Sequence, residues 1–385
     1  MAAFAMICSM ASCKGNIDDK MDAIFQPVFP EGEPGGAVLL MRQGKILYDK
    51  GFGVADLKTG AAIDGNTSFN IASCSKQFTA VAVLQLVSQG NLSLEDKIID
   101  YFPEFLQGKP CDSLWKDIRV KHLLSHSSGI PDGRGYLSCE AKIAGDETLA
   151  MEYLYSLDHL NFPPGTQYEY INPTFVLLGR LVEKVSGEEF TFYVKNHIFG
   201  PAGMSQTVYF DRDHQEAISN MAHGYEYDDV SSMGEERVPS EDGLTEKKDW
   251  YEYDFGEETF FATRPDGGIY SSTREIAKWE KVLQKAEIID TQLLEDAWTA
   301  RVKVSGSPWS DYQNRPGTWY GYGWFIEKDS ADDAPRCIYH TGDNGGFKAL
   351  VARYPASETL LVILANRADW DRAGVKSQVE NLLGI

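Results

Sequence analysis

Ser73 and Lys76 are the residues of this sequence whose types and spacing could carry out chemistry. A serine hydroxyl is a poor nucleophile at neutral pH and needs a neighbouring base to take its proton. Residues three apart lie on one face of a helix, so Lys76 would stand directly beside Ser73. The same spacing separates Ser113 from Lys116. The spacing alone therefore does not decide which serine is the nucleophile.

The segments around Ser73 predict how it is positioned. Residues 78–87 are apolar nearly all round, which indicates a buried helix that runs to about residue 90. Ser73 is expected in its first turn, where free backbone N–H groups and the helix dipole favour developing negative charge. Upstream, a helix over 18–29 and a strand–turn–strand hairpin over 37–41 and 45–48 are predicted.

The rest of the chain is predicted to be helical first and then rich in strands. Residues 91 to about 260 look mostly helical and loop-rich, with Tyr170 and Asn172 on a loop before a helix over 174–186. Strands are expected over 320–327, 336–340, 347–354 and 359–365, with a turn at 343–346, and a helix over 370–383 ends the chain. Strands at both ends imply a sheet domain with a helical domain inserted.

The predicted fold is α/β (α+β), an antiparallel sheet flanked by helices with an inserted, mainly helical domain. The sheet domain is assigned to residues 18–85 and 262–385, and the helical domain to residues 86–261. Residues 226–258 hold thirteen Asp or Glu against three Lys or Arg, together with several aromatic residues. We interpret this acidic insertion as a solvated surface segment, with a lid over a cleft as the alternative that the aromatic residues favour.

Composition excludes several classes of function. The 385 residues are 43% hydrophobic and 24% charged, as in an ordinary soluble globular protein. A net charge of −21 argues against nucleic acid or an anionic membrane surface as partner. The six cysteines form no C-x-x-C pair, and no H-E-x-x-H occurs, so neither a metal nor another cofactor is predicted. No apolar run approaches the ~20 residues of a membrane span.

The N-terminal residues suggest export. Residues 1–12 are small and apolar, and Met10-Ala11-Ser12-Cys13 resembles a bacterial lipoprotein box, in which Cys13 would be lipidated after cleavage. No Lys or Arg precedes this stretch, and it is short for a signal peptide. We expect a periplasmic or outer-surface lipoprotein, attached to a membrane only through Cys13 and with residues 1–17 as signal and linker. A frayed terminus on a cytoplasmic protein is the alternative.

Three motifs occur in a fixed order along the chain: Ser73-Cys74-Ser75-Lys76, Tyr170-Ile171-Asn172 and His340-Thr341-Gly342. This order resembles the serine β-lactamase-related family, which includes class C β-lactamases, DD-peptidases, D-amino-acid peptidases and certain carboxylesterases. The phrases Leu123-Leu124-Ser125-His126-Ser127-Ser128-Gly129 and Gly267-Gly268-Ile269-Tyr270-Ser271 add to the resemblance. The resemblance implies a β-lactamase/penicillin-binding-protein-like fold and selects Ser73 over Ser113.

The resemblance also implies roles for these residues. Ser73 would attack an acyl carbonyl, and Lys76, if desolvated, would lose its proton more easily and could act as the base. Tyr170 could share the base role and return the proton to the leaving group, and this division of labour is left open. Asn172 would orient Lys76 and the acyl side chain. The backbone N–H groups of Ser73 and Asp343 would form the oxyanion hole.

His340 and Asp343 depart from the common pattern of the family and bear on the substrate. His340 stands where β-lactamases often carry lysine, before Thr341 and Gly342 of the same substrate-binding motif. A histidine is charged only below a pKa near 6.5, and Asp343 would add a negative charge if it faces the pocket. We therefore expect esters or amides without a free carboxylate, or D-amino-acid substrates with a free amine.

Several other interpretations remain from the sequence. A small molecule or a peptide is the expected substrate, and a β-lactamase or DD-carboxypeptidase is the alternative enzyme. A non-catalytic penicillin-binding sensor is the alternative of another class. His126 is interpreted as a capping or core histidine and is left out of the predicted site.

Overall fold

The computed structural model describes residues 8–106, 114–131, 147–211, 217–227, 250–252, 263–304, 317–330 and 333–385, with the backbone alone for residues 8–16. Ser113 and most of the acidic insertion lie outside the described residues. In the part of the chain that is described, no helix is long and apolar enough to cross a membrane.

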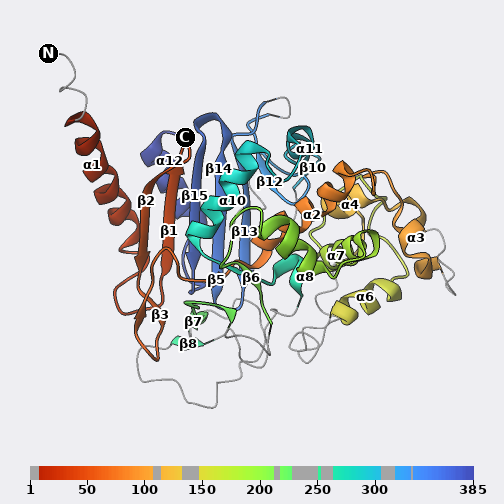
Figure 1. The fold of residues 1–385 in the computed structure, drawn as a ribbon, viewed down its shortest axis with the longest axis horizontal. Coiled ribbons are helices and arrows are strands. Elements are labelled where there is room, and N and C mark those ends of the chain that lie inside the picture. The colour runs from red at the N-terminus through yellow and green to blue at the C-terminus, as the bar shows by residue number, and fades with distance from the viewer. Residues whose placement is uncertain are drawn as a thin grey trace.

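An eight-stranded antiparallel sheet forms the centre of the molecule (Figure 1). Its strand order is β10-β11-β12-β13-β14-β15-β1-β2, so strands from the two ends of the chain pair side by side. The strands are β1 (Gly36–Arg42), β2 (Lys45–Phe52), β10 (Val302–Lys303), β11 (Thr318–Tyr320), β12 (Phe325–Glu327), β13 (Cys337–Asn344), β14 (Phe347–Tyr354) and β15 (Thr359–Ala365). The predicted fold class and its antiparallel sheet are confirmed.

The central strands are apolar at successive positions because both faces of the sheet are covered. In β1, Leu39 and Met41 belong to one hydrophobic core, whereas Val38 and Leu40 belong to a second core on the opposite face. Successive side chains of a strand point to opposite faces, so a strand between two cores needs apolar residues throughout. All seven residues of β15 are buried for the same reason.

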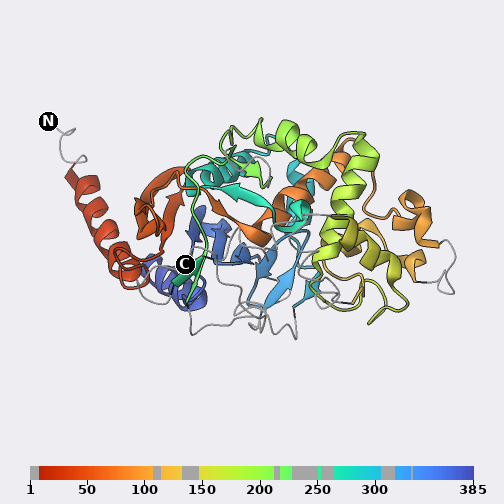
Figure 2. The same cartoon turned by 90° about the horizontal axis from the view of Figure 1, so that it is seen from below.

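Helices cover the two faces from different parts of the chain (Figures 1 and 2). One face packs against α1 (Cys8–Phe25) and α12 (Arg372–Leu383), and the other against α10 (Thr273–Lys285). Beyond β13 lie α2 (Lys76–Ser88), which packs on α7, and the middle helices α3 (Ile98–Tyr101), α4 (Val120–Leu124), α6 (Glu147–Ser156), α7 (Asn172–Ser186) and α8 (Phe190–Val194) (Figure 1). The division into two domains stays a prediction.

Short elements connect these layers. They include the strands β3 (Val54–Asp56), β4 (Ala61–Ala62), β5 (Phe69–Asn70), β6 (Val208–Tyr209), β7 (Tyr225–Tyr227), β8 (Trp250–Glu252) and β9 (Ile269–Ser271), and the helices α9 (Arg264–Gly267) and α11 (Thr291–Ala297). The single-turn helices are η1 (Ala72–Ser75), η2 (Pro103–Leu106), η3 (Trp115–Asp117), η4 (Lys195–Phe199) and η7 (Pro355–Ser357). β5, β9 and β6 form a small sheet, and the chain passes from β5 into η1.

Several predicted boundaries were wrong. The strand expected over 320–327 is two strands, β11 and β12, because Gly323 has a φ of +87° and turns the chain between them. The turn expected over 343–346 is only the pair Gly345 and Gly346, so Asp343 belongs to β13. The N-terminal helix runs over Cys8–Phe25 rather than over 18–29, and α12 begins at Arg372 rather than at residue 370.

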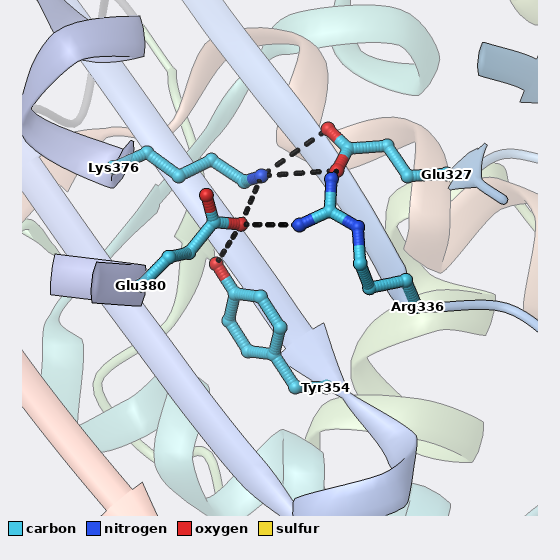
Figure 3. A network of polar contacts seen from close by, with 5 residues as sticks. All are labelled: Glu327, Arg336, Tyr354, Lys376 and Glu380. Atoms are coloured by element: carbon cyan, nitrogen blue, oxygen red, sulfur yellow. Dashed lines mark hydrogen bonds and ion pairs between the residues drawn. The ribbon is translucent and has the colours of Figure 1, made fainter. Parts of the chain in front are cut away.

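A buried ionic network attaches α12 to the sheet (Figure 3). Lys376 Nζ donates hydrogen bonds to Glu380 Oε1 at 2.6 Å and to the two carboxylate oxygens of Glu327 at 3.2 and 3.1 Å. Arg336 pairs with both carboxylates, and the Tyr354 hydroxyl donates to Glu380. Two cations thus face two carboxylates, which compensates the cost of burying the charges. The network fixes α12, whose first residue contacts the site described next.

Candidate active site

Ser73 lies at a sharp turn between β5 and α2. The residue before it, Ala72, has a left-handed φ of +46°, and its backbone N–H donates to the Asn70 side chain at 2.8 Å. Left-handed backbone is costly for a residue with a Cβ and is found at functional sites. Ser73 therefore sits in the 3₁₀ turn η1 and not in the first turn of α2, which begins at Lys76. The prediction of its local structure was wrong by one turn.

Lys76 is completely buried beside Ser73. Its Nζ lies 3.0 Å from Ser73 Oγ and donates a hydrogen bond to the backbone oxygen of Asp266 at 2.8 Å. The same nitrogen lies 5.0 Å from the centre of the Tyr170 ring. Burial lowers the pKa of Lys76 to about 8, and the charge of Asp266 opposes this shift. A lysine with this pKa can take the Ser73 proton near neutral pH.

Tyr170 lies on the loop before α7, and its ring faces Lys76. Its buried hydroxyl has no hydrogen-bond partner among the described residues. Burial raises the pKa of Tyr170 well above 10, an effect that the nearby Ser73 side chain partly offsets. The hydroxyl is therefore a neutral phenol at pH 7. It is placed to give a proton to a group bound at Ser73 or to relay one from it.

His126 holds the Tyr170 loop in place. Its Nδ1 accepts a hydrogen bond from the backbone N–H of Ile171 at 3.2 Å, and its ring centre lies 4.2 Å from that of Tyr170. Burial lowers the pKa of His126 well below 6.5, so the ring is neutral. Its placement is that of a core histidine, as interpreted from the sequence, but it packs directly on the predicted site.

Asn172 is the first residue of α7, whereas the sequence placed it on the loop before the helix. Its Oδ1 is buried and has no hydrogen-bond partner among the described residues. Lys76 donates instead to Ser73 and to the backbone of Asp266. The role of Asn172 in orienting Lys76 or the acyl group stays a prediction.

The end of β13 lies against η1, and Gly342 permits this approach. A Cβ at Gly342 would collide with the backbone oxygen of Ile71, so a larger residue would push the strand away from the turn that carries Ser73. The buried thiol of Cys74 donates to the backbone oxygen of His340 at 3.3 Å across the same contact. The backbone of Asp343 follows directly. The predicted pairing of the Ser73 and Asp343 N–H groups in an oxyanion hole stays a prediction that this packing favours.

The His340 ring is neutral, and each of its two nitrogens has a polar partner. Its Nε2 lies 2.9 Å from the Tyr320 hydroxyl, and its Nδ1 lies 2.6 Å from the backbone oxygen of Thr341, which is itself buried. Burial and the neighbouring Lys76 lower the pKa of His340 to about 3. The expectation that His340 gains a charge below about pH 6.5 was therefore wrong, because that value applies to a histidine in water.

The Asp343 carboxylate forms an ion pair with Arg372, the first residue of α12. Arg372 Nη2 lies 3.0 Å from Asp343 Oδ2, and Nη1 also donates to the backbone oxygens of Gly342 and Ala349. Asp343 is thus not an uncompensated negative charge at the site.

Sequence reasoning missed Arg372 and Asp266. Asp266 directly precedes the Gly267-Gly268 phrase, but Arg372 carries no motif signal.

The other predicted features are placed outside this cluster or outside the described residues. Cys13 lies within α1, and its side chain is not among those described. Lys116 of the second S-x-x-K is exposed on η3, and its partner Ser113 is not described. Among the described residues, no group of histidine, cysteine or acidic side chains could hold a metal ion. The serine nucleophile Ser73, the lysine base Lys76 and the neutral phenol of Tyr170 form a set of groups that suits acyl transfer.

Comparison with known proteins agrees with this geometry. The sequence profile of the family described as Beta-lactamase matches residues 17–383. Penicillin-binding protein 4* of Bacillus subtilis is 28% identical over 378 residues, which cover 96% of this chain and 77% of that protein. Protein flp of Staphylococcus aureus is 24% identical over 350 residues; the match covers 90% of this chain and only 62% of flp.

A solved structure gives the same fold. The D-amino acid amidase of Ochrobactrum anthropi SV3, in complex with L-phenylalanine amide, is 22% identical and superposes with a TM-score of 0.71. The likeness covers 95% of this chain and 97% of that one. The chain therefore belongs to the beta-lactamase family and is a serine hydrolase of that family.

Proposed function

We propose that the protein cleaves esters or amides through an acyl-enzyme on Ser73. Ser73 Oγ attacks the acyl carbonyl carbon while its proton passes to Lys76. Lys76 passes a proton on to the leaving group, either directly or through the Tyr170 hydroxyl, which gives its own proton to the leaving group as it takes up the one from Lys76. The bond to the leaving group then breaks, and the leaving group takes up that proton. Water attacks the acyl-enzyme by the reverse sequence, which releases the acid and restores the serine.

One observation carries this proposal: a completely buried lysine lies 3.0 Å from a serine hydroxyl. Burial of an ammonium group is costly and is compensated elsewhere in this chain by carboxylates, as around Lys376. Lys76 instead contacts a hydroxyl and a backbone oxygen. Such an environment favours the neutral amine, which is the form that activates a nucleophile.

The charges around the site support substrates without a free carboxylate. His340 is neutral, and the guanidinium of Arg372 is engaged by Asp343 and two backbone oxygens. A substrate carboxylate would therefore find no cation of the kind that a lysine at position 340 would supply. The likeness to a D-amino acid amidase and the net charge of −21 also support a D-aminoacyl amide with a free amine as substrate.

A matched pair of esters tests this preference. We expect kcat/KM for p-nitrophenyl butyrate to exceed that for mono-p-nitrophenyl succinate, which differs by a carboxylate, by about 10- to 100-fold, because burying a carboxylate without a partner costs about 1–3 kcal/mol. A D-alanine p-nitroanilide and a chromogenic cephalosporin complete the panel. Preference for the succinate, or rapid cephalosporin turnover, would instead indicate a β-lactamase or DD-carboxypeptidase. A stable cephalosporin adduct without turnover would indicate a penicillin-binding sensor.

We also propose that the protein is an exported lipoprotein, anchored at Cys13 in the periplasm or on the outer surface. The Met10-Ala11-Ser12-Cys13 box supports this proposal, as does α1, whose first turns extend away from the sheet (Figure 1). In a bacterial host, metabolic labelling with an alkyne fatty acid is expected to mark the wild type but not Cys13→Ser, and the wild type should fractionate with membranes. Equal labelling of the two, or a wild type found only in the cytoplasm, would contradict the proposal.

A further inference from the structure

Asp266 is a buried carboxylic acid beside Lys76 that belongs to none of the three motifs. It lies on α9, which is fixed against the site from several sides. Thr79 of α2 donates a hydrogen bond to the backbone oxygen of Pro265, and Ile269 N–H donates to Ser75 Oγ at 3.2 Å. At Gly179, α7 approaches Pro265 so closely that a Cβ would collide with the ring. The position of Asp266 relative to Lys76 is therefore set by the fold.

The Asp266 side chain is sealed from solvent. The residue is only 6% exposed, and its Oδ1 is buried without a hydrogen-bond partner among the described residues. Burial raises the pKa of Asp266, while the charge of Lys76 and the Thr263 side chain oppose this shift. Because the carboxylate is enclosed, it is not placed to bind a substrate ammonium. Its neighbour within the site is Lys76, which already contacts the Asp266 backbone at 2.8 Å.

The other titratable groups that act on Lys76 are neutral at pH 7. Burial raises the pKa of the Cys74 thiol to about 12 and that of Tyr170 well above 10. Burial lowers the pKa of His126 well below 6.5 and that of His340 to about 3. Asp343 belongs to β13, and its carboxylate is paired with Arg372. Among these described groups, Asp266 is thus the acid whose unpaired charge reaches Lys76.

We propose that Asp266 is a positioning residue that controls the protonation of Lys76 through the negative charge of its buried carboxylate, which the fold holds near the lysine. The carboxylate favours the ammonium form of Lys76 and so delays its conversion to the free amine as the pH rises. The pair thereby sets the pH range in which Ser73 is activated. This inference rests on the proposed function, because it concerns the same acyl transfer.

The test is the pH dependence of Asp266→Asn, a neutral replacement of the same shape. Removing a negative charge disfavours the ammonium form, so the pKa of Lys76 must fall. In the wild type, the plot of kcat/KM against pH is expected to change with a midpoint near pH 8, where Lys76 titrates. In the variant, the midpoint of the same change should lie about one pH unit lower. If Lys76 acts as the free amine, this is the acidic limb, and activity at pH 6 relative to the plateau rises about tenfold. If the ammonium form is needed, it is the basic limb, but the shift has the same direction.

Two readouts and a matched control make the result specific. The rate of p-nitrophenyl butyrate hydrolysis and the rate of Ser73 labelling by a fluorophosphonate, followed by intact mass, should shift together. Glu280→Gln is the control, because Glu280 is a buried acid that pairs with Arg353 at 3.0 Å and does not act on Lys76. Its midpoint should equal that of the wild type. Asp266→Ser, a smaller neutral residue, serves if Asp266→Asn is unstable in a thermal melt.

The outcomes separate the two proposals. A downward shift in the Asp266 variants, with the control unchanged, supports the inference. An unshifted or upward-shifted midpoint in variants that turn over substrate overturns it and leaves the hydrolase proposal standing. A wild type without turnover that depends on Ser73 refutes the proposed function, and the inference about Asp266 fails with it.

Discussion

Ser73→Ala is expected to lower kcat/KM for p-nitrophenyl butyrate by about 10⁴-fold or more, to the level of the uncatalysed background. The substitution removes the atom that forms the acyl bond, and no other hydroxyl is placed 3.0 Å from Lys76 Nζ among the described residues. The fold should persist, because Ser73 is partly exposed and its removed oxygen contributes little to packing. Initial rates corrected for spontaneous hydrolysis measure the loss, and a thermal melt checks the fold.

The second S-x-x-K supplies the control for this experiment. Ser113 stands three residues before Lys116, the same spacing as that of Ser73 and Lys76, but Lys116 is exposed to solvent. The control variant is Ser113→Ala. Its kcat/KM should stay within about twofold of the wild type, since the lysine of this pair, Lys116, is exposed and does not belong to the cluster around Ser73. Loss of activity in Ser113→Ala together with full activity in Ser73→Ala would reverse the assignment of the nucleophile.

Lys76→Met is expected to lower kcat/KM by about 10³-fold, because loss of a general base typically costs 10²- to 10⁴-fold. Methionine matches the length and apolar surroundings of the lysine, so the loss should appear in kcat and in the rate of fluorophosphonate labelling. Lys116→Met is the control and should retain full activity. Activity of Lys76→Met within tenfold of the wild type at pH 7 would show that another group activates Ser73.

Lys76→Met also leads to a prediction about the free energy of unfolding. The pKa of Lys76 falls from 10.5 in water to about 8 in the folded chain, which means that folding disfavours its charged form. This destabilisation is fully present below pH 8 and is relieved as the pH rises toward 10.5, and it amounts to at most about 3 kcal/mol. Urea unfolding of Lys76→Met at pH 7 should therefore give a free energy of unfolding equal to or higher than that of the wild type, despite the loss of activity. A clear decrease would contradict a strained, functional lysine.

The features that could be predicted from the sequence are those carried by local patterns. The strands β1, β14 and β15 and the helix α2 follow from continuous runs of apolar residues, and α7 follows from apolar residues with helical spacing. Ser73, Lys76 and Tyr170 were recognised because the three motifs occur in order, and the structure brings these side chains together. Ser73 was misplaced by one turn, in α2 instead of the 3₁₀ turn η1, because the left-handed φ at Ala72 interrupts the helical pattern.

The charges of the site could not be predicted, because they depend on contacts between distant segments. His340 was assigned the pKa of a free histidine, whereas burial against Tyr320 and Lys76 keeps it neutral. Arg372 lies 29 residues beyond its partner Asp343 and belongs to no motif. Asp266 meets Lys76 across 190 residues of sequence. Periodicity reports which face of an element is buried, but it does not report which polar groups meet there.

The most direct test of the central claim is to trap the acyl-enzyme and locate it. Wild type and Ser73→Ala would be mixed with p-nitrophenyl butyrate, quenched in acid within the first turnover, and analysed by intact mass and peptide mapping. We predict that the wild type gains one butyryl group, that the group maps to Ser73, and that Ser73→Ala gains none. A butyryl group on another residue, or steady turnover in the wild type with no acylated species, would contradict the account.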